Sequence, residues 1–156
     1  MNRDISLKTV TFICTGNTCR SVMGEKILSK MVREKGLSGL NVQSAGTAAI
    51  PGYSIYGDLK TALDIKGIEY SGHIPRMVDR NIMEESDIIL AMTREHSGYL
   101  KERFSEYADK VFMLSEFAGA GREDIPDPIG QGVETYLRVY DSIEEYLVKM
   151  KERLFK

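Results

Sequence analysis

The side chains best suited to chemistry stand in one short stretch near the N-terminus. This stretch, VTFICTGNTCRS, ends an apolar run with Cys14 and places Arg20 six positions further on. A cysteine near a helix N-terminus and a cation is stabilised as the reactive thiolate. The planar guanidinium of Arg20 can bind two oxygens of a phosphate at once. The two residues predict a thiolate beneath a bound phosphoryl group, from where it can attack phosphorus.

The loop between Cys14 and Arg20 has the composition of an anion-binding loop. Gly16 tolerates backbone angles that other residues avoid, and Asn17 also adopts the left-handed conformation readily. Such a loop above a helix N-terminus can direct its N–H groups toward an anion, and the Ser21 hydroxyl can donate to the Cys14 sulfur. We therefore expect the substrate to be bound by Thr15, Gly16, Asn17, Thr18, Cys19 and Ser21.

Two alternatives concern this loop. A strand cysteine taken alone is more often a buried, inert thiol, although the Gly, Asn, Arg and Ser that follow favour the phosphate-binding interpretation. The loop also differs from the P-loop of nucleotide-binding proteins, because it lacks the terminal Gly-Lys-Ser/Thr of that motif.

Displacement at phosphorus also needs an acid for the leaving group. The candidate is Asp127, in the segment DIPDPIG of residues 124–130. The proline that follows biases Asp127 toward an extended backbone, which can hold its carboxylate away from the loop. A plain Asp-Pro turn is the alternative.

Short apolar strands and amphipathic helices alternate along the chain. Strands are predicted at residues 9–13, 40–44, 87–92 and 110–114, helices at 21–35, 57–66, 94–104 and 133–154, and a long loop at 119–132. This pattern predicts an α/β three-layer sandwich, with a short parallel sheet between helices on both faces and the phosphate-binding loop after the first strand. Ligands of such sheets bind at the carboxyl ends of the strands, where Cys14 lies.

Individual residues are assigned to helix ends and surfaces. Ser21 and Thr93 are expected to cap the first and third long helices, and Gly36 to end the first. His96 follows two charged residues, which predicts a surface position. His73 is expected to be structural, with bracing of the phosphate loop as the alternative.

The composition predicts one domain, residues 1–156, in the cytoplasm. The chain is 42% hydrophobic and 28% charged with a net charge of −2, so it offers no basic surface for nucleic acid. It shows neither a bilayer-spanning run nor a signal-peptide pattern. Two cysteines and two histidines are too few to predict a zinc site, so we expect no metal and no cofactor.

Taken together, the motifs resemble those of the low-molecular-weight protein tyrosine phosphatases over nearly the whole chain. CTGNTCRS, Ser44-Ala45-Gly46, Ala91-Met92-Thr93 and Asp127-Pro128 occur in that family's order and spacing. The resemblance implies that Cys14 forms a phosphocysteine, that Arg20 binds the phosphoryl oxygens, and that Asp127 protonates the leaving group and then activates water. We also expect a monomer that acts on a phosphorylated protein, with inorganic phosphate as product or inhibitor.

The resemblance assigns roles to further residues of the loop. Ser21 would stabilise the sulfur as a leaving group, while Asn17 and Ser44 would hold the loop in shape. Cys19 would form a reversible disulfide with Cys14 that protects the nucleophile from irreversible oxidation; a small packing residue is the alternative.

Departures from the tyrosine phosphatase pattern bear on the substrate. Thr18 stands where tyrosine-specific members usually have an aliphatic residue, and Ile129-Gly130 replaces an aromatic residue after Asp127-Pro128. Both features resemble the bacterial protein arginine phosphatases and favour phosphoarginine over phosphotyrosine. Tyr53 and Tyr56 keep phosphotyrosine open, because either could stack on a phenol ring.

Two other functions are alternatives. Arsenate reductases of the same fold relay electrons through later cysteines, and no cysteine follows Cys19. A non-catalytic phosphoprotein-binding module would be expected to lack the nucleophile or the acid, and both are present.

Overall fold

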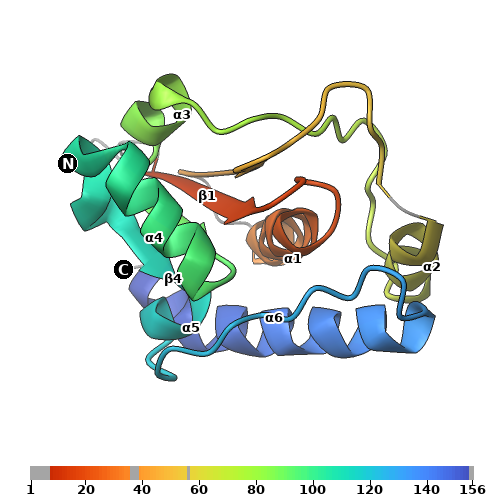
Figure 1. The fold of residues 1–156 in the computed structure, drawn as a ribbon. Coiled ribbons are helices and arrows are strands. Elements are labelled where there is room, and N and C mark those ends of the chain that lie inside the picture. Colours follow the sequence, from red (N-terminus) through yellow and green to blue (C-terminus); the bar gives the residue numbers. More distant parts are fainter. Residues whose placement is uncertain (1–7, 36–38, 56, 155–156) are drawn as a thin grey trace.

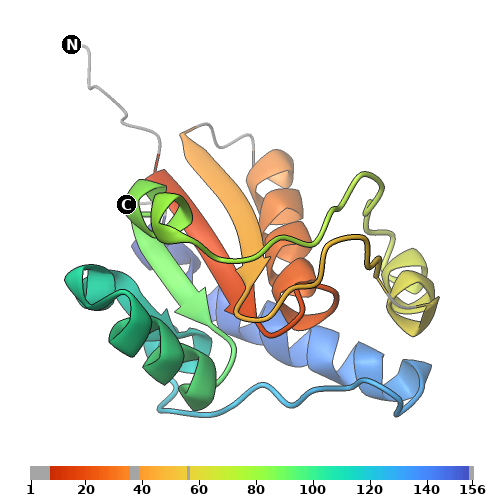
Figure 2. The same ribbon diagram turned by 45° about the horizontal axis from the view of Figure 1, so that its top comes forward.

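The computed structural model describes residues 8–35, 39–55 and 57–154. At its centre lies a four-stranded parallel sheet with the strand order β2-β1-β3-β4 (Figure 2). The strands are β1 (Lys8–Cys14), β2 (Leu40–Gly46), β3 (Ile88–Ala91) and β4 (Val111–Met113). Because all four run in one direction, their carboxyl ends meet at one edge of the sheet, where β1 ends in Cys14.

Helices cover both faces of the sheet, which confirms the predicted three-layer architecture. They are α1 (Arg20–Glu34), α2 (Gly57–Ile65), α3 (Arg80–Glu85), α4 (Arg94–Arg103), the 3₁₀ helix η1 (Ser105–Lys110), α5 (Leu114–Phe117) and α6 (Val133–Leu154). One core joins Phe12 and Leu90 of the sheet to α1, α2, α5 and α6. The other joins the neighbouring residues Ile13 and Ile89 to α3 and α4, as the alternation of side chains along a strand requires.

Helix α6 has the amphipathic pattern predicted for residues 133–154. Its buried stripe consists of Tyr136, Val139, Tyr140, Ile143, Leu147 and Met150. With this stripe α6 packs against α1, α2 and α5 (Figure 1). Among the residues that the structure describes, no helix is both long and apolar enough to cross a membrane.

A glycine sets how closely α1 approaches the sheet. A Cβ atom on Gly24 would lie 2.5 Å from the ring of Phe12 in β1, closer than two carbon atoms can pack. The absence of a side chain at this position lets α1 lie directly against β1. Residues 15–19 form the loop that joins the two elements, and the packing of α1 on β1 fixes both its ends.

Several details differ from the sequence predictions. Helix α1 begins at Arg20 with Cys19 in the capping position and no side-chain cap, so the prediction that Ser21 caps it is wrong. The predicted last strand ends early because Leu114 already begins α5. The cap at Thr93 is confirmed, since its side chain accepts a hydrogen bond from the His96 N–H. The predicted stop at Gly36 lies outside the described residues.

Candidate active site

A pocket of about 230 Å³ opens where β1 ends and α1 begins. Its lining combines the loop after β1 with residues from two distant segments. The lining residues are Cys14, Thr15, Gly16, Thr18, Cys19, Arg20, Ala48, Ile50, Tyr53, Asp127 and Ile129. The structure thus brings seven of the nine predicted site residues to one pocket. Asn17 and Ser21, the other two, are fully buried behind it. Tyr56 lies outside the described residues.

Cys14 is buried at the base of this pocket. Its Sγ atom lies 2.9 Å from the hydroxyl oxygen of Ser21, and its side chain is 2% exposed. Because Ser21 is the second residue of α1, its hydroxyl does not cap the helix, and the predicted contact with the Cys14 sulfur is confirmed. The position at the end of a strand, directly below the first turn of a helix, is the one in which a thiolate is stabilised by N–H groups.

Asn17 holds the loop from behind. It has a left-handed backbone with φ 56°, and its Nδ2 donates to the hydroxyls of Ser21 and Ser44, both at 2.9 Å. Its Oδ1 accepts the N–H of Arg76 at 3.0 Å, and its carbonyl oxygen accepts from His73 Nε2 at 2.8 Å. His73 therefore braces the loop, the alternative that sequence analysis left open, and the bracing roles expected for Asn17 and Ser44 have a structural basis.

The segment after β2 supports the loop from a second side. The N–H groups of Thr47 and Ala48 donate to the carbonyl oxygens of Cys14 and Thr15, both at 2.9 Å. A Cβ atom on Gly46 would lie 2.3 Å from the Thr15 carbonyl oxygen. The loop therefore rests directly on the backbone of Gly46.

We expect Gly46→Ala to destabilise the protein by about 1–3 kcal/mol, because the added methyl group meets a backbone atom that cannot rotate away. The displaced loop should also lower kcat/KM. Urea unfolding and a phosphatase assay check both effects. Gly98→Ala in α4 is the matched control, since no atom lies within 4 Å of its Cβ position and alanine favours a helix by about 1 kcal/mol. Equal stability of Gly46→Ala and the wild type would contradict the prediction.

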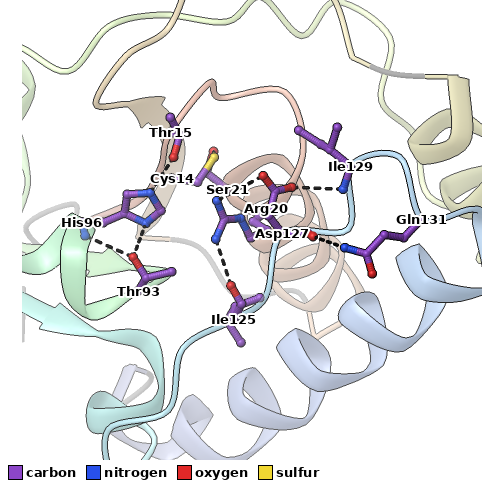
Figure 3. A network of polar contacts seen from close by, with 10 residues as sticks. All are labelled: Cys14, Thr15, Arg20, Ser21, Thr93, His96, Ile125, Asp127, Ile129 and Gln131. Carbon is purple, nitrogen blue, oxygen red and sulfur yellow. Dashed lines mark hydrogen bonds and ion pairs between the residues drawn. The ribbon is translucent and has the colours of Figure 1, made fainter.

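Arg20 and Asp127 face each other across the pocket (Figure 3). Arg20 is 6% exposed, and its Nη1 donates to the carbonyl oxygen of Ile125 at 2.9 Å. Its Nη2 lies 3.9 Å from Oδ2 of Asp127, whose side chain is 48% exposed. Oδ1 of Asp127 accepts the N–H of Ile129 at 3.1 Å. The guanidinium is thus oriented by the protein, and one carboxylate oxygen of Asp127 remains free of a hydrogen bond to the described residues.

The loop of residues 119–132 brings Asp127 to the pocket. It runs back along α6 from α5 to the start of that helix (Figure 2). Two contacts tie it to the carboxyl edge of the sheet: the Ile125 N–H donates to the carbonyl oxygen of Met92 at 2.9 Å, and Asp124 accepts from the Arg94 N–H at 2.8 Å. The segment therefore places the carboxylate of Asp127 at the pocket and is more than the plain Asp-Pro turn given as the alternative.

His96 is the site residue that the sequence analysis missed. It is 5% exposed, so its predicted surface position is wrong. Its Nε2 lies 2.8 Å from Oγ1 of Thr15, and its Nδ1 lies 3.0 Å from Oγ1 of Thr93. Burial, and then the charge of Arg20, lower the pKa of His96 to about 4. The cap at Thr93 predicts that His96 lies in the first turn of α4, but it does not predict that the ring is buried.

Cys19, the second cysteine of the loop, is 3% exposed. Burial raises the pKa of its thiol, and the neighbouring Cys14 raises it further. Both cysteines are free thiols in this structure. The reversible disulfide between them stays a prediction.

The arrangement can perform nucleophilic substitution at phosphorus. A sulfur nucleophile lies below an anion-binding loop, a buried arginine stands at its side, and a half-exposed carboxylate faces it. In the part of the chain that the structure describes, no three His, Cys, Asp or Glu side chains are grouped so as to hold a metal ion.

Comparisons with known proteins agree with this chemistry. The family model described as low molecular weight phosphotyrosine protein phosphatase matches residues 9–156. The chain is 35% identical over 147 residues to a Bacillus subtilis protein named protein-arginine-phosphatase, with 94% of this chain and 97% of that protein covered.

Solved structures show the same fold. A structure of a YwlE arginine phosphatase mutant with a phosphorylated active-site serine superposes with a TM-score of 0.90 at 34% identity, covering 95% of this chain and 96% of that one. A low molecular weight protein tyrosine phosphatase from T. tengcongensis gives a TM-score of 0.88 at 32% identity, covering 94% of this chain and 99% of that one.

Proposed function

The chain belongs to the low molecular weight phosphotyrosine protein phosphatase family, and from this premise we propose that it hydrolyses phosphoarginine in proteins through a phosphocysteine on Cys14. It is an enzyme, a protein phosphatase that acts on phosphorylated protein substrates. The observation that carries the proposal is the convergence of Cys14, Arg20 and Asp127 on one pocket.

In the first step the thiolate of Cys14 attacks phosphorus. The S–P bond forms as the P–N bond of phosphoarginine breaks, and the departing guanidine nitrogen takes the proton of Asp127. Arg20 and the loop N–H groups bind the three phosphoryl oxygens, whose charge they stabilise in the transition state. The relative with a phosphorylated active-site serine supports a covalent intermediate at the corresponding place.

In the second step water attacks the phosphocysteine. Asp127, now ionised, takes a proton from the water as the new P–O bond forms and the S–P bond breaks. The electron pair returns to Cys14 as a thiolate. The Ser21 hydroxyl, 2.9 Å from Sγ, can donate a hydrogen bond to that thiolate and so makes it a better leaving group.

The pocket wall supports phosphoarginine as the substrate. Thr18 lines the pocket and is only 6% exposed. A larger aliphatic residue at this position would fill pocket space that threonine leaves open. The half-exposed carboxylate of Asp127 can accept hydrogen bonds from the N–H groups of a guanidinium. The phenol ring of phosphotyrosine has no such donors. The relative named protein-arginine-phosphatase adds to this support.

Phosphotyrosine is the second candidate, and one observation favours it. Tyr53, 56% exposed, and Ile50, 50% exposed, both line the pocket and could pack on a phenol ring. A relative of similar identity is named a protein tyrosine phosphatase.

The two candidates are separated by kcat/KM on matched phosphoarginine and phosphotyrosine peptides of the same sequence. A clear preference for phosphoarginine is expected. A preference for phosphotyrosine would retain the phosphocysteine mechanism and overturn the substrate assignment. Absence of phosphate release from either peptide and from p-nitrophenyl phosphate would return the non-catalytic binding module to consideration.

We expect Thr18→Ile to shift the ratio of the two kcat/KM values toward phosphotyrosine by about tenfold or more, the size of effect that one methylene has in a binding pocket. Thr18→Val is the matched control, because it removes the hydroxyl without adding volume. A shift with isoleucine alone assigns selectivity to volume, and a shift with both assigns it to the hydroxyl. An unchanged ratio in both variants would remove Thr18 as the selector.

The remaining expectations are part of the same proposal. A single domain, a cytoplasmic location, a monomeric state and inorganic phosphate as product or inhibitor stay predictions from the sequence. Size-exclusion chromatography with light scattering checks the monomer.

A further inference from the structure

The imidazole ring of His96 is held between two threonine hydroxyls. Thr15, on one side, is exposed and lines the pocket, while Thr93, on the other, caps α4. The two ring nitrogens lie 2.8 Å and 3.0 Å from the respective Oγ1 atoms. Figure 3 shows this chain of three side chains beside Cys14.

A count of hydrogens limits how the three groups can be bonded. The ring is neutral at ordinary pH because burial and Arg20 lower its pKa to about 4, so one nitrogen donates and the other accepts. Either Thr15 donates to Nε2, or Nε2 donates to Thr15. The Thr93 oxygen already accepts the His96 backbone N–H at 3.1 Å. When Nε2 donates to Thr15, the Thr93 hydroxyl can therefore donate its own proton to Nδ1.

An anion in the pocket selects between these arrangements. If Thr15 donated to Nε2, its oxygen would present only lone pairs to a phosphoryl group, which is repulsive. If Nε2 donates to Thr15, the hydroxyl proton is free to bond a phosphoryl oxygen. All donors and acceptors are then used in one direction: the His96 backbone N–H to Thr93, Thr93 to Nδ1, Nε2 to Thr15, and Thr15 to the anion.

We propose that His96 is a positioning residue, which donates to Thr15 and thereby directs the Thr15 hydroxyl proton to a phosphoryl oxygen in the pocket. Thr15 then adds a side-chain donor to those of the backbone and Arg20. The inference rests on the proposed function in that its ligand is the phosphoryl group bound at the same site. It also gives the loop a further anchor, from the first turn of α4, in addition to Asn17 and the segment after β2.

The first test compares Thr15→Val, which keeps the shape but removes the hydroxyl, with Thr15→Ser, which keeps the hydroxyl. Calorimetry with inorganic phosphate should show about tenfold weaker binding by the valine variant, the usual effect of losing one hydrogen bond to a charged group, and near wild-type binding by the serine variant. With p-nitrophenyl phosphate the valine variant should raise KM more than it lowers kcat. Wild-type phosphate affinity in Thr15→Val would overturn the proposal.

The second test isolates the part of His96. His96→Leu should weaken phosphate binding as Thr15→Val does, and should add little in the Thr15→Val background, because it acts through that hydroxyl. His96→Gln, whose amide can still donate, should recover most of the affinity. An equal further loss in the valine background would overturn the proposal.

Nitrogen chemical shifts of the His96 ring in the phosphate-bound wild type provide a measurement that needs no variant. They should show the proton on Nε2, and a proton on Nδ1 would overturn the proposal even if His96→Leu does not fold. Phosphate affinity and ring shifts do not depend on turnover, so failure of the proposed function in the peptide assay would be distinguished from failure of this inference.

Discussion

Replacing Cys14 by serine is expected to abolish turnover, with a loss of several orders of magnitude in kcat, as when other enzymes lose their nucleophile. The serine hydroxyl is not ionised near neutral pH, so it attacks phosphorus far more slowly than a thiolate. It is also a poorer leaving group in the second step. Any phosphoserine that forms should therefore persist, and intact-protein mass spectrometry after incubation with substrate should detect it. The relative with a phosphorylated active-site serine makes this readout realistic.

The matched control is Cys19→Ser, in the same loop. Cys19 is buried to the same degree as Cys14, but burial and the adjacent Cys14 raise the pKa of its thiol and keep it protonated. It should lose much less activity, and both variants should melt near the wild-type temperature because serine fits where each thiol lay. Retained turnover in Cys14→Ser would contradict the phosphocysteine mechanism.

Strands β1, β3 and β4 could be predicted because they are largely apolar runs between clear breakers, whereas β2 has polar residues at Asn41, Gln43 and Ser44. Strand β3 follows an acidic turn and ends two residues before the cap Thr93, so both its ends are marked in the sequence. Helix α3 was missed for the opposite reason: its six residues contain only two buried apolar side chains, Ile82 and Met83, too few to show a helical period. Its cap, Asp79, was the remaining signal.

The site divides in the same way between local and long-range features. Cys14 and Arg20 are six residues apart, so one strand-to-helix loop fixes their relation and the sequence predicts it. The role of His96 could not be predicted, because its partner Thr15 lies 81 residues earlier in the chain. The sequence offers Ser21 two tasks, to cap α1 or to bond the Cys14 sulfur, and only the start of α1 at Arg20 decides for the second.

Asp127→Asn is expected to slow hydrolysis by about 10²–10⁴-fold for substrates with poor leaving groups, the usual contribution of a general acid. Asparagine has the same shape and can still accept the Ile129 N–H through Oδ1, but its amide has no acidic proton to transfer to the leaving group. The lost ion pair with Arg20, 3.9 Å long and half exposed on the Asp127 side, contributes less than about 1 kcal/mol to stability. The variant should therefore stay folded while its chemistry fails.

The leaving group distinguishes an acid from a merely structural carboxylate. Activated aryl phosphates such as p-nitrophenyl phosphate expel a stable anion that needs little protonation, so they should be the least affected in a series of phosphate esters measured with Asp127→Asn. Asp124→Asn is the control, because Asp124 lies in the same loop but bonds the Arg94 N–H and does not line the pocket. It should leave the dependence of rate on leaving group as in the wild type. An equal loss on all esters in Asp127→Asn would mean that Asp127 shapes the pocket around Arg20, and the proton would then have to come from another group.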